Sequence, residues 1–141
     1  EVPDRRRILF LCIHNSCRSQ MAEGLMRHLG GGRFEAHSAG IERCGVHPFA
    51  VRAMAELGID ISGQRSKTIE ELEERDFDVV VTTCQEAQEA CPRWPGQAEV
   101  VHWSLPDPAA AEGPEAERMA AFRQVRDAIA ERVKGLLEGC G

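Results

Sequence analysis

Apolar residues occur along the chain in two patterns, as short unbroken runs and as regularly spaced positions. The run 8–11 reads Ile-Leu-Phe-Leu, which is typical of a strand buried on both faces of a sheet. From Ser19 onward the spacing becomes helical, with apolar side chains at Ala22, Leu25, Met26 and Leu29. The glycines at 30–32 predict the end of this helix.

The same alternation continues to the end of the chain. β-Branched and aromatic residues predict further strands at 34–39, 77–82 and 100–103. Helices are expected from Pro48 to Gly58, over 68–75 and from about Pro114 to Leu137. In the first of these, the core-facing residues are expected to be Ala50, Met54 and Leu57. The last helix carries an apolar stripe formed by Met119, Phe122, Val125, Ile129, Val133 and Leu136.

Strands that alternate with helices imply right-handed crossovers and a parallel sheet. We therefore expect residues 1–141 to form a single α/β domain, with a four-stranded parallel sheet and helices on both faces. Sheets of this kind bind ligands at the carboxyl ends of their strands. The segment that follows the first strand is thus the first place to look for chemistry.

Composition narrows the class of partner and the compartment. A formal net charge of −6 argues against nucleic acid or an anionic membrane as partner. No apolar run has the length of a membrane span, and no signal-peptide pattern opens the sequence. Six cysteines without such a signal indicate a reducing compartment, so we expect a cytoplasmic protein.

The cysteine spacings bear on metal binding. Six residues separate Cys84 from Cys91, and no histidine pair has the spacing of zinc ligands. We therefore expect no structural metal and no cofactor. Catalytic or redox-active cysteines are the alternative that the spacings favour.

The segment Cys12–Ser19 lies between the first strand and the first helix and reads Cys-x5-Arg-Ser. Such a loop can curl so that successive backbone N–H groups converge on one anion, and the helix N-terminus adds positive potential. Arg18 supplies a planar fork for two oxygens of a tetrahedral oxyanion. The same field favours the thiolate form of Cys12, and Ser19 can donate a hydrogen bond to it. The residues expected to bind the anion are Ile13, His14, Asn15, Ser16, Cys17 and Arg18.

Residues 12–19, continued by Gln-Met-Ala-Glu-Gly at 20–24, resemble the active-site loop of the low-molecular-weight tyrosine phosphatase fold. Within that fold the chain is most similar to the thioredoxin-coupled arsenate reductases, and the similarity continues through 38–41 and 58–62. The resemblance implies arsenate as substrate and thioredoxin as reductant; nothing suggests more than a monomer. One residue departs from the pattern, because His14 stands where the family usually has a small residue, commonly glycine.

Asp107 lies between Pro106 and Pro108 in a late loop and matches the Asp-Pro of this fold. The resemblance implies that this carboxylic acid protonates the leaving oxygen in the phosphatases and assists hydroxide release in the reductases. An aspartate between prolines is also a common turn. Its assignment as a catalytic acid therefore depends on the matching loop at Cys12.

Cys84 and Cys91 bound a segment that directly follows the strand expected at 77–82. Its composition favours a helix, which Pro92 would end. In a helix the two cysteines would lie roughly 10 Å apart along the axis, whereas a disulfide needs Cα atoms within about 7 Å. The segment must therefore unwind before this pair can oxidise.

The resemblance supplies the order of a three-cysteine relay. Cys12 attacks arsenate, Cys84 attacks Cys12 and releases arsenite, and Cys91 attacks Cys84 to leave a disulfide for thioredoxin. Cys12, Arg18 and Asp107 alone would fit a phosphatase equally well, so a phosphatase is the main rival. A chain without tyrosine is poorly suited to phosphotyrosine, although weak activity on small aryl phosphates is expected. A non-catalytic anion-binding or redox-sensing module is the third possibility.

The sequence also gives expectations for two further cysteines and for a cation site. We expect Cys17 to pack beneath the loop and Cys44 to have no role. Some relatives hold potassium beside the active loop, and the positions that match their ligands are Asn15, Glu23 and Ser38. Because Lys67 stands where those relatives carry an acidic ligand, we expect no potassium requirement.

Overall fold

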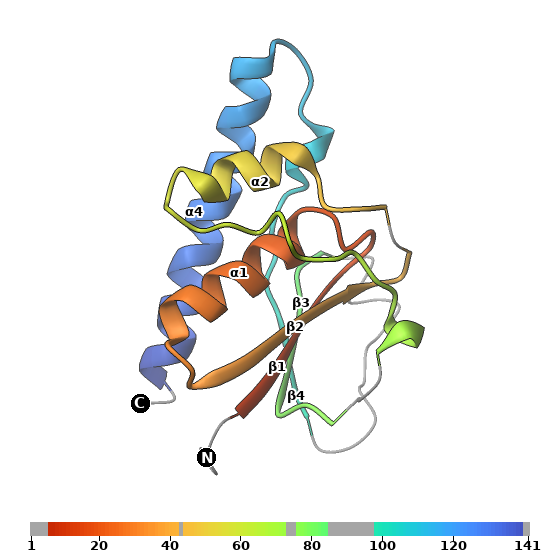
Figure 1. The fold of residues 1–141 in the computed structure, drawn as a ribbon, viewed down its shortest axis with the longest axis vertical. Helices are drawn as coiled ribbons and strands as arrows, with labels where there is room; N and C mark the ends of the chain where they lie inside the picture. The colour runs from red at the N-terminus through yellow and green to blue at the C-terminus, as the bar shows by residue number, and fades with distance from the viewer. Residues whose placement is uncertain (1–5, 43, 73–75, 85–97, 140–141) are drawn as a thin grey trace.

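Parallel strands form the centre of the molecule. The computed structural model describes residues 6–42, 44–72, 76–84 and 98–139. The strands of the sheet are β1 (Arg6–Cys12), β2 (Phe34–Gly40), β3 (Val79–Thr82) and β4 (Glu99–His102). They pair in the order β2-β1-β3-β4, all parallel (Figure 1), so the expected four-stranded parallel sheet is confirmed.

β1 has a neighbouring strand on each side, and its side chains are buried on both faces of the sheet. Ile8 and Phe10 belong to one core cluster, and Leu9 and Leu11 belong to the other. This division follows from the alternation of side chains along a strand. All of these residues are at most 1 % exposed, which is why the strand requires an unbroken apolar run.

Helices cover one face of the sheet. They are α1 (Arg18–Gly30), α2 (Pro48–Ala55) and α4 (Glu115–Gly139), which lie on the same side (Figure 1). Met21 of α1 and Phe122 of α4 are in the same core cluster as Phe10 of β1. In the described part of the chain the other face is covered by the 3₁₀ turn η1 (Ile69–Glu71) and the adjoining Leu72. None of the described helices is both long and apolar enough to cross a membrane.

Several expectations about the helices were wrong in detail. Of the helix expected over 68–75, the described part forms only the turn Ile69–Glu71, after which Leu72 is extended; residues 73–75 lie outside the described residues. Leu57 does not face the core but is 43 % exposed, because α2 has already ended at Ala55. In α4 the buried stripe is completed by Leu137, which is 6 % exposed, and Leu136 only packs against its edge.

β1 is an inner strand, so its carboxyl end lies between the carboxyl ends of β2 and β3. The chain passes from β1 to β2 on one side, while β3 lies on the other side, so the loop after β1 opens at a topological switch point. Thr83, just after β3, donates its N–H and its hydroxyl to the Leu11 carbonyl oxygen at 2.8 and 2.7 Å. The segments that follow β1 and β3 are thereby held side by side.

Candidate active site

The loop between β1 and α1 forms the base of a pocket. Cys12 is the last residue of β1, and α1 begins at Arg18. In the middle of the loop Asn15 has a φ of 50°, a left-handed conformation that asparagine tolerates better than most residues. The N-cap residue Cys17 makes no capping hydrogen bond with its side chain. The N–H groups of the first helical turn are therefore available to an anion.

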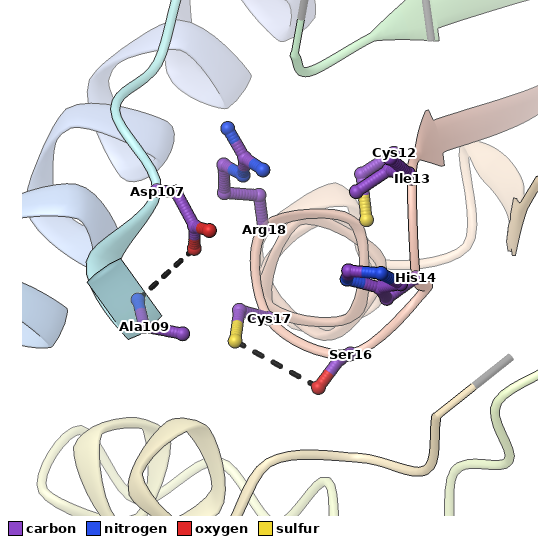
Figure 2. Close-up of a pocket in the computed structure, with 8 residues that line it drawn as sticks. All are labelled: Cys12, Ile13, His14, Ser16, Cys17, Arg18, Asp107 and Ala109. Atoms are coloured by element: carbon purple, nitrogen blue, oxygen red, sulfur yellow. Dashed lines mark hydrogen bonds between the residues drawn. The ribbon is translucent and has the colours of Figure 1, made fainter. Parts of the chain in front are cut away.

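Two loops far apart in the sequence line this pocket (Figure 2). Its lining residues are Cys12, Ile13, His14, Ser16, Cys17, Arg18, Asp107 and Ala109. The structure thus brings together almost all of the residues expected to act on an oxyanion. Asn15 differs from the expectation, because it is fully buried and its side chain supports the loop from behind.

Arg18 has one part of its guanidinium anchored and another available. Its Nη1 donates a hydrogen bond to the Leu105 carbonyl oxygen at 3.0 Å. Its Nε is buried without a hydrogen-bond partner, and no other buried side-chain nitrogen or oxygen of the described residues is in that state. Leaving a buried donor unpaired costs about 1–3 kcal/mol. Such a donor on a residue that lines the pocket indicates a place where an oxyanion completes the hydrogen bonding.

Hydrogen bonds direct the Ser19 hydroxyl toward Cys12. The backbone N–H of Lys67 donates to Asn15 Oδ1 at 2.8 Å, which identifies the oxygen of that amide. Asn15 Nδ2 must then be the donor to Ser19 Oγ at 2.8 Å. Because Ser19 accepts this bond, its own proton is available to Cys12 Sγ, 2.9 Å away. Ser19 is therefore placed to donate a hydrogen bond to the sulfur of Cys12.

Two glutamines support this arrangement, and the sequence analysis missed both. Gln20 is fully buried, and its Nε2 donates to Asn15 Oδ1 at 2.9 Å and to the Asn15 carbonyl oxygen at 3.1 Å. Gln64 Nε2 in turn donates to Gln20 Oε1 at 2.7 Å. A buried amide requires such partners. No spacing in the sequence distinguishes these glutamines, so only the fold identifies them as positioning residues.

Asp107 lies at the edge of the pocket (Figure 2). Its Oδ1 accepts a hydrogen bond from the Ala109 N–H at 3.0 Å, which caps the 3₁₀ turn η2 (Pro108–Ala110). Pro108 is buried and anchors this turn, whereas Asp107 itself is exposed. The carboxylate is therefore held at the pocket by local structure and remains open to solvent, as a group that exchanges protons requires.

Cys17 lines the wall of the pocket and also belongs to the buried core cluster that includes Phe10 and Met21. It is 6 % exposed, and this burial raises the pKa of its thiol to about 12. A thiol in such an environment stays protonated at neutral pH. Cys17 is therefore unsuited to act as the nucleophile, although it lies beside Cys12 in the lining.

We expect brief alkylation at a pH of about 8 to modify Cys12 and to spare Cys17. With a pKa of about 12, only about one Cys17 in 10⁴ is deprotonated at that pH. Mass spectrometry of the peptides after iodoacetamide treatment measures both cysteines separately. In urea both should react, which serves as the control. Similar labelling of the two in the folded chain would contradict the prediction.

Cys84 lies in the same buried cluster as Cys12. It follows Thr83, which is hydrogen-bonded to the Leu11 carbonyl oxygen, and its own side chain is buried, with 2 % exposed. It belongs to the same apolar cluster as Cys12 and Leu11. The fold thus brings together two cysteines that are far apart in the sequence. Cys91, and the helical segment expected before it, lie outside the described residues.

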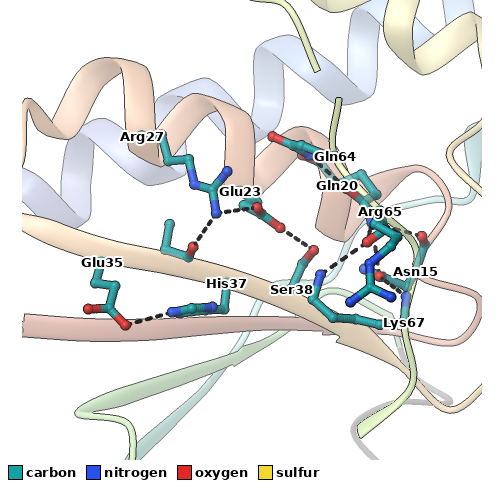
Figure 3. Close-up of polar contacts among 11 residues, drawn as sticks. Asn15, Gln20, Glu23, Arg27, Glu35, His37, Ser38, Gln64, Arg65 and Lys67 are labelled. Atoms are coloured by element: carbon teal, nitrogen blue, oxygen red, sulfur yellow. Dashed lines mark hydrogen bonds and ion pairs between the residues drawn. The ribbon is translucent and has the colours of Figure 1, made fainter. Parts of the chain in front are cut away.

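A buried carboxylate beside this loop is already paired with a cation (Figure 3). Ser38 Oγ donates to Glu23 Oε1 at 2.5 Å, and Arg27 pairs with the other Glu23 oxygen at 2.7 Å. Lys67 donates from Nζ to the Arg65 carbonyl oxygen at 3.0 Å. Burial lowers the pKa of the Lys67 ammonium, while the charge of Glu23 acts in the opposite direction. The absence of a potassium requirement stays a prediction, which equal turnover in sodium and potassium salts would support.

Comparisons with known proteins agree with this geometry. Residues 7–140 match the family described as low molecular weight phosphotyrosine protein phosphatase. The arsenate reductase of Halalkalibacterium halodurans is 50 % identical over 135 residues, which cover 96 % of this chain and 97 % of that protein. The glutaredoxin arsenate reductase of Synechocystis sp. is 41 % identical over 132 residues, with coverages of 94 % and 96 %.

Solved structures show the same similarity. An arsenate reductase in the oxidised state superposes with a TM-score of 0.82 at 38 % identity, covering 96 % of this chain and 99 % of that one. An arsenate reductase in the phosphate-binding state gives 0.80 at 40 % identity, with the same coverages of 96 % and 99 %. A thioredoxin-dependent arsenate reductase of Corynebacterium glutamicum gives 0.75 at 25 % identity, covering 99 % of this chain and 63 % of that one. The chain therefore belongs to the low molecular weight phosphotyrosine protein phosphatase family, in which its close relatives include arsenate reductases.

Proposed function

We propose that this chain reduces arsenate to arsenite, with Cys12 as the nucleophile and Cys84 as the first resolving thiol. The observation that carries this proposal is the shared cluster of Cys12 and Cys84 at the carboxyl ends of adjacent strands. A phosphatase needs the loop, Arg18 and Asp107 but has no use for a second buried cysteine at the nucleophile. The arsenate reductases among the relatives support the same conclusion.

The first step is attack on the bound oxyanion. The N–H groups of residues 13–17 and the unpaired Arg18 Nε hold arsenate, and the Cys12 thiolate forms a bond to arsenic. An arsenic–oxygen bond breaks, and Asp107 supplies a proton so that the oxygen leaves as water. Ser19, through its hydrogen bond to Cys12 Sγ, holds the sulfur in place for the attack.

The second step transfers two electrons. Cys84 attacks Cys12 Sγ, a disulfide forms, and the sulfur–arsenic bond breaks with its electron pair remaining on arsenic. Arsenic(V) thus becomes arsenic(III) and leaves as arsenite. Cys91 then attacks Cys84, which frees Cys12 and leaves a Cys84–Cys91 disulfide that a dithiol reductant restores.

Thioredoxin is the reductant that this scheme favours. A disulfide within the chain is reduced by exchange with a protein dithiol, which is the chemistry of thioredoxin. One relative is a glutaredoxin arsenate reductase and another is a thioredoxin-dependent arsenate reductase, so the two reductants must be compared directly. We propose that the chain acts as a monomer in the cytoplasm, where the thiols of Cys12, Cys17 and Cys44 stay reduced.

The test is arsenate-dependent oxidation of NADPH in the presence of thioredoxin and thioredoxin reductase, with glutaredoxin and glutathione in a parallel assay. Turnover is expected with thioredoxin, should vanish in Cys12→Ser, and should persist in the matched variant Cys44→Ser. No arsenate turnover with either reductant, together with Cys12-dependent cleavage of an aryl phosphate, would establish a phosphatase instead. Weak cleavage of small aryl phosphates beside arsenate turnover is expected, because both reactions use the same anion site.

Ser19→Ala should lower kcat/KM for arsenate by about tenfold to a hundredfold. The substitution removes the donor to the Cys12 thiolate, and a hydrogen bond to a charged group contributes about 1.5–3 kcal/mol. The rate of Cys12 alkylation should fall as well, which a merely structural change would not produce. Ser62→Ala, at an exposed serine bonded to Asp60, is the control. Unchanged alkylation in Ser19→Ala would refute this role.

A further inference from the structure

A cluster of metal-binding side chains lies at the rim of the active loop, outside the residues used for chemistry. His14 comes from the active loop, and Glu42 and Cys44 come from the segment after β2. One ligand atom from each of the three lies within 4.8 Å of the other two, and His14 Nε2 is 3.4 Å from Glu42 Oε1. Glu42 and Cys44 are exposed and His14 is partly so, which leaves the cluster open to a cation from solvent.

Backbone hydrogen bonds hold the two segments in this register. The Glu42 N–H donates to the Ile13 carbonyl oxygen at 2.8 Å, and the Cys44 N–H donates to the His14 carbonyl oxygen at 3.3 Å. A third segment also contacts this loop, because the Ser66 hydroxyl donates to the His14 carbonyl oxygen at 3.1 Å. The side chains of the cluster therefore project from a fixed base, and only their own rotamers need to adjust.

We propose that His14, Glu42 and Cys44 form a reversible site for a zinc-class cation. An imidazole nitrogen, a carboxylate oxygen and a thiolate are the ligand types that zinc accepts together, whereas magnesium and calcium require oxygen ligands. Zinc bonds of about 2.0–2.3 Å at tetrahedral angles separate ligand atoms by about 3.3–3.8 Å. Exposed side chains whose ligand atoms already lie within 4.8 Å reach that geometry by small rotations. Water would complete the fourth position.

Metal binding at this site would connect to the active loop through His14, which also lines the pocket. A bound cation displaces the proton of the Cys44 thiol and adds positive charge at the pocket rim. It also joins the active loop to the segment after β2 by a bond stronger than the His14–Glu42 contact. His14, which stands where the family usually has a small residue, and Cys44, which takes no part in the proposed relay, thereby receive a common explanation.

The test is titration with Co²⁺, whose thiolate complexes absorb light, followed by displacement with Zn²⁺. A variant of the chain with Cys12, Cys84, Cys91 and Cys140 replaced by serine retains Cys44 and the protonated, buried Cys17. This variant should bind one equivalent with a sulfur-to-cobalt band, and the added change Cys44→Ser should abolish that band. Glu42→Gln and His14→Gly should each weaken binding by at least about tenfold. His28→Gln, at an exposed histidine of α1, should have no effect.

The otherwise unaltered chain provides a second measurement that does not depend on the serine replacements. In competition with a chromophoric chelator, it should take up one more equivalent of Zn²⁺ than its Cys44→Ser variant does. A cobalt–sulfur band that survives Cys44→Ser, or equal zinc uptake by the chain and that variant, would overturn the proposal. Both readouts are independent of arsenate reduction, so a failure here is distinct from a failure of the proposed function.

Discussion

Cys84→Ser is expected to abolish thioredoxin-coupled turnover of arsenate while leaving Cys12-dependent cleavage of an aryl phosphate within about threefold of the parent. Cleavage of a phosphate ester uses the loop, Arg18 and Asp107, all of which the substitution leaves in place. Reduction of arsenic needs a second thiol that forms a disulfide with Cys12 as the sulfur–arsenic bond breaks, and Cys84 lies in the same cluster as Cys12. Comparing the two activities therefore separates electron transfer from anion chemistry.

The aryl phosphate assay also controls for folding, since Cys84 is 2 % exposed and a serine there introduces a buried hydroxyl. Cys91→Ser is the complementary variant. It should complete one turnover and then stop, with a Cys12–Cys84 disulfide that mass spectrometry detects. Sustained arsenate turnover by Cys84→Ser would contradict the relay, and parallel loss of both activities would show that the pocket itself had been damaged.

Arg18→Lys should lower kcat/KM by about 10²–10³-fold for arsenate and for an aryl phosphate alike. Arg18 is buried, donates from Nη1 to the Leu105 carbonyl oxygen, and has an unpaired Nε at the pocket. A lysine keeps the positive charge but presents one compact ammonium group, which cannot bind Leu105 and two oxygens of the oxyanion at once. The loss is therefore expected from geometry, with the net charge unchanged.

Arg33→Lys provides the matched control, because Arg33 is exposed beyond the end of α1. It should leave both activities unchanged. Inorganic phosphate binding, measured by calorimetry, should weaken in Arg18→Lys and remain normal in Arg33→Lys. An Arg18→Lys protein with activity within threefold of the parent would show that charge alone suffices and that the fork is not used.

Local sequence determines much of the fold, because several helices and strands can be predicted from residues adjacent in the chain. The apolar run of β1 favours a strand with both faces covered, and the structure places it as an inner strand of the sheet. Gly31 takes a left-handed conformation (φ 58°) at the end of α1, as the glycine run predicts. The exposure of Leu57 was mispredicted because helical spacing alone does not reveal that α2 ends at Ala55.

The sequence by itself determined which candidate residues share the loop, because Cys12, Arg18 and Ser19 lie within the short segment that joins β1 to α1. Only the tertiary structure decided what surrounds that loop. The pairing of β1 with β3 brings Cys84 into the same buried cluster as Cys12, and distant segments supply the Leu105 oxygen for Arg18 and the Lys67 N–H for Asn15. These contacts depend on the order of the strands and on how the chain crosses between them, both of which are set by burial of the whole core. The sequence around Cys84, Leu105 and Lys67 therefore contains no local pattern that predicts them.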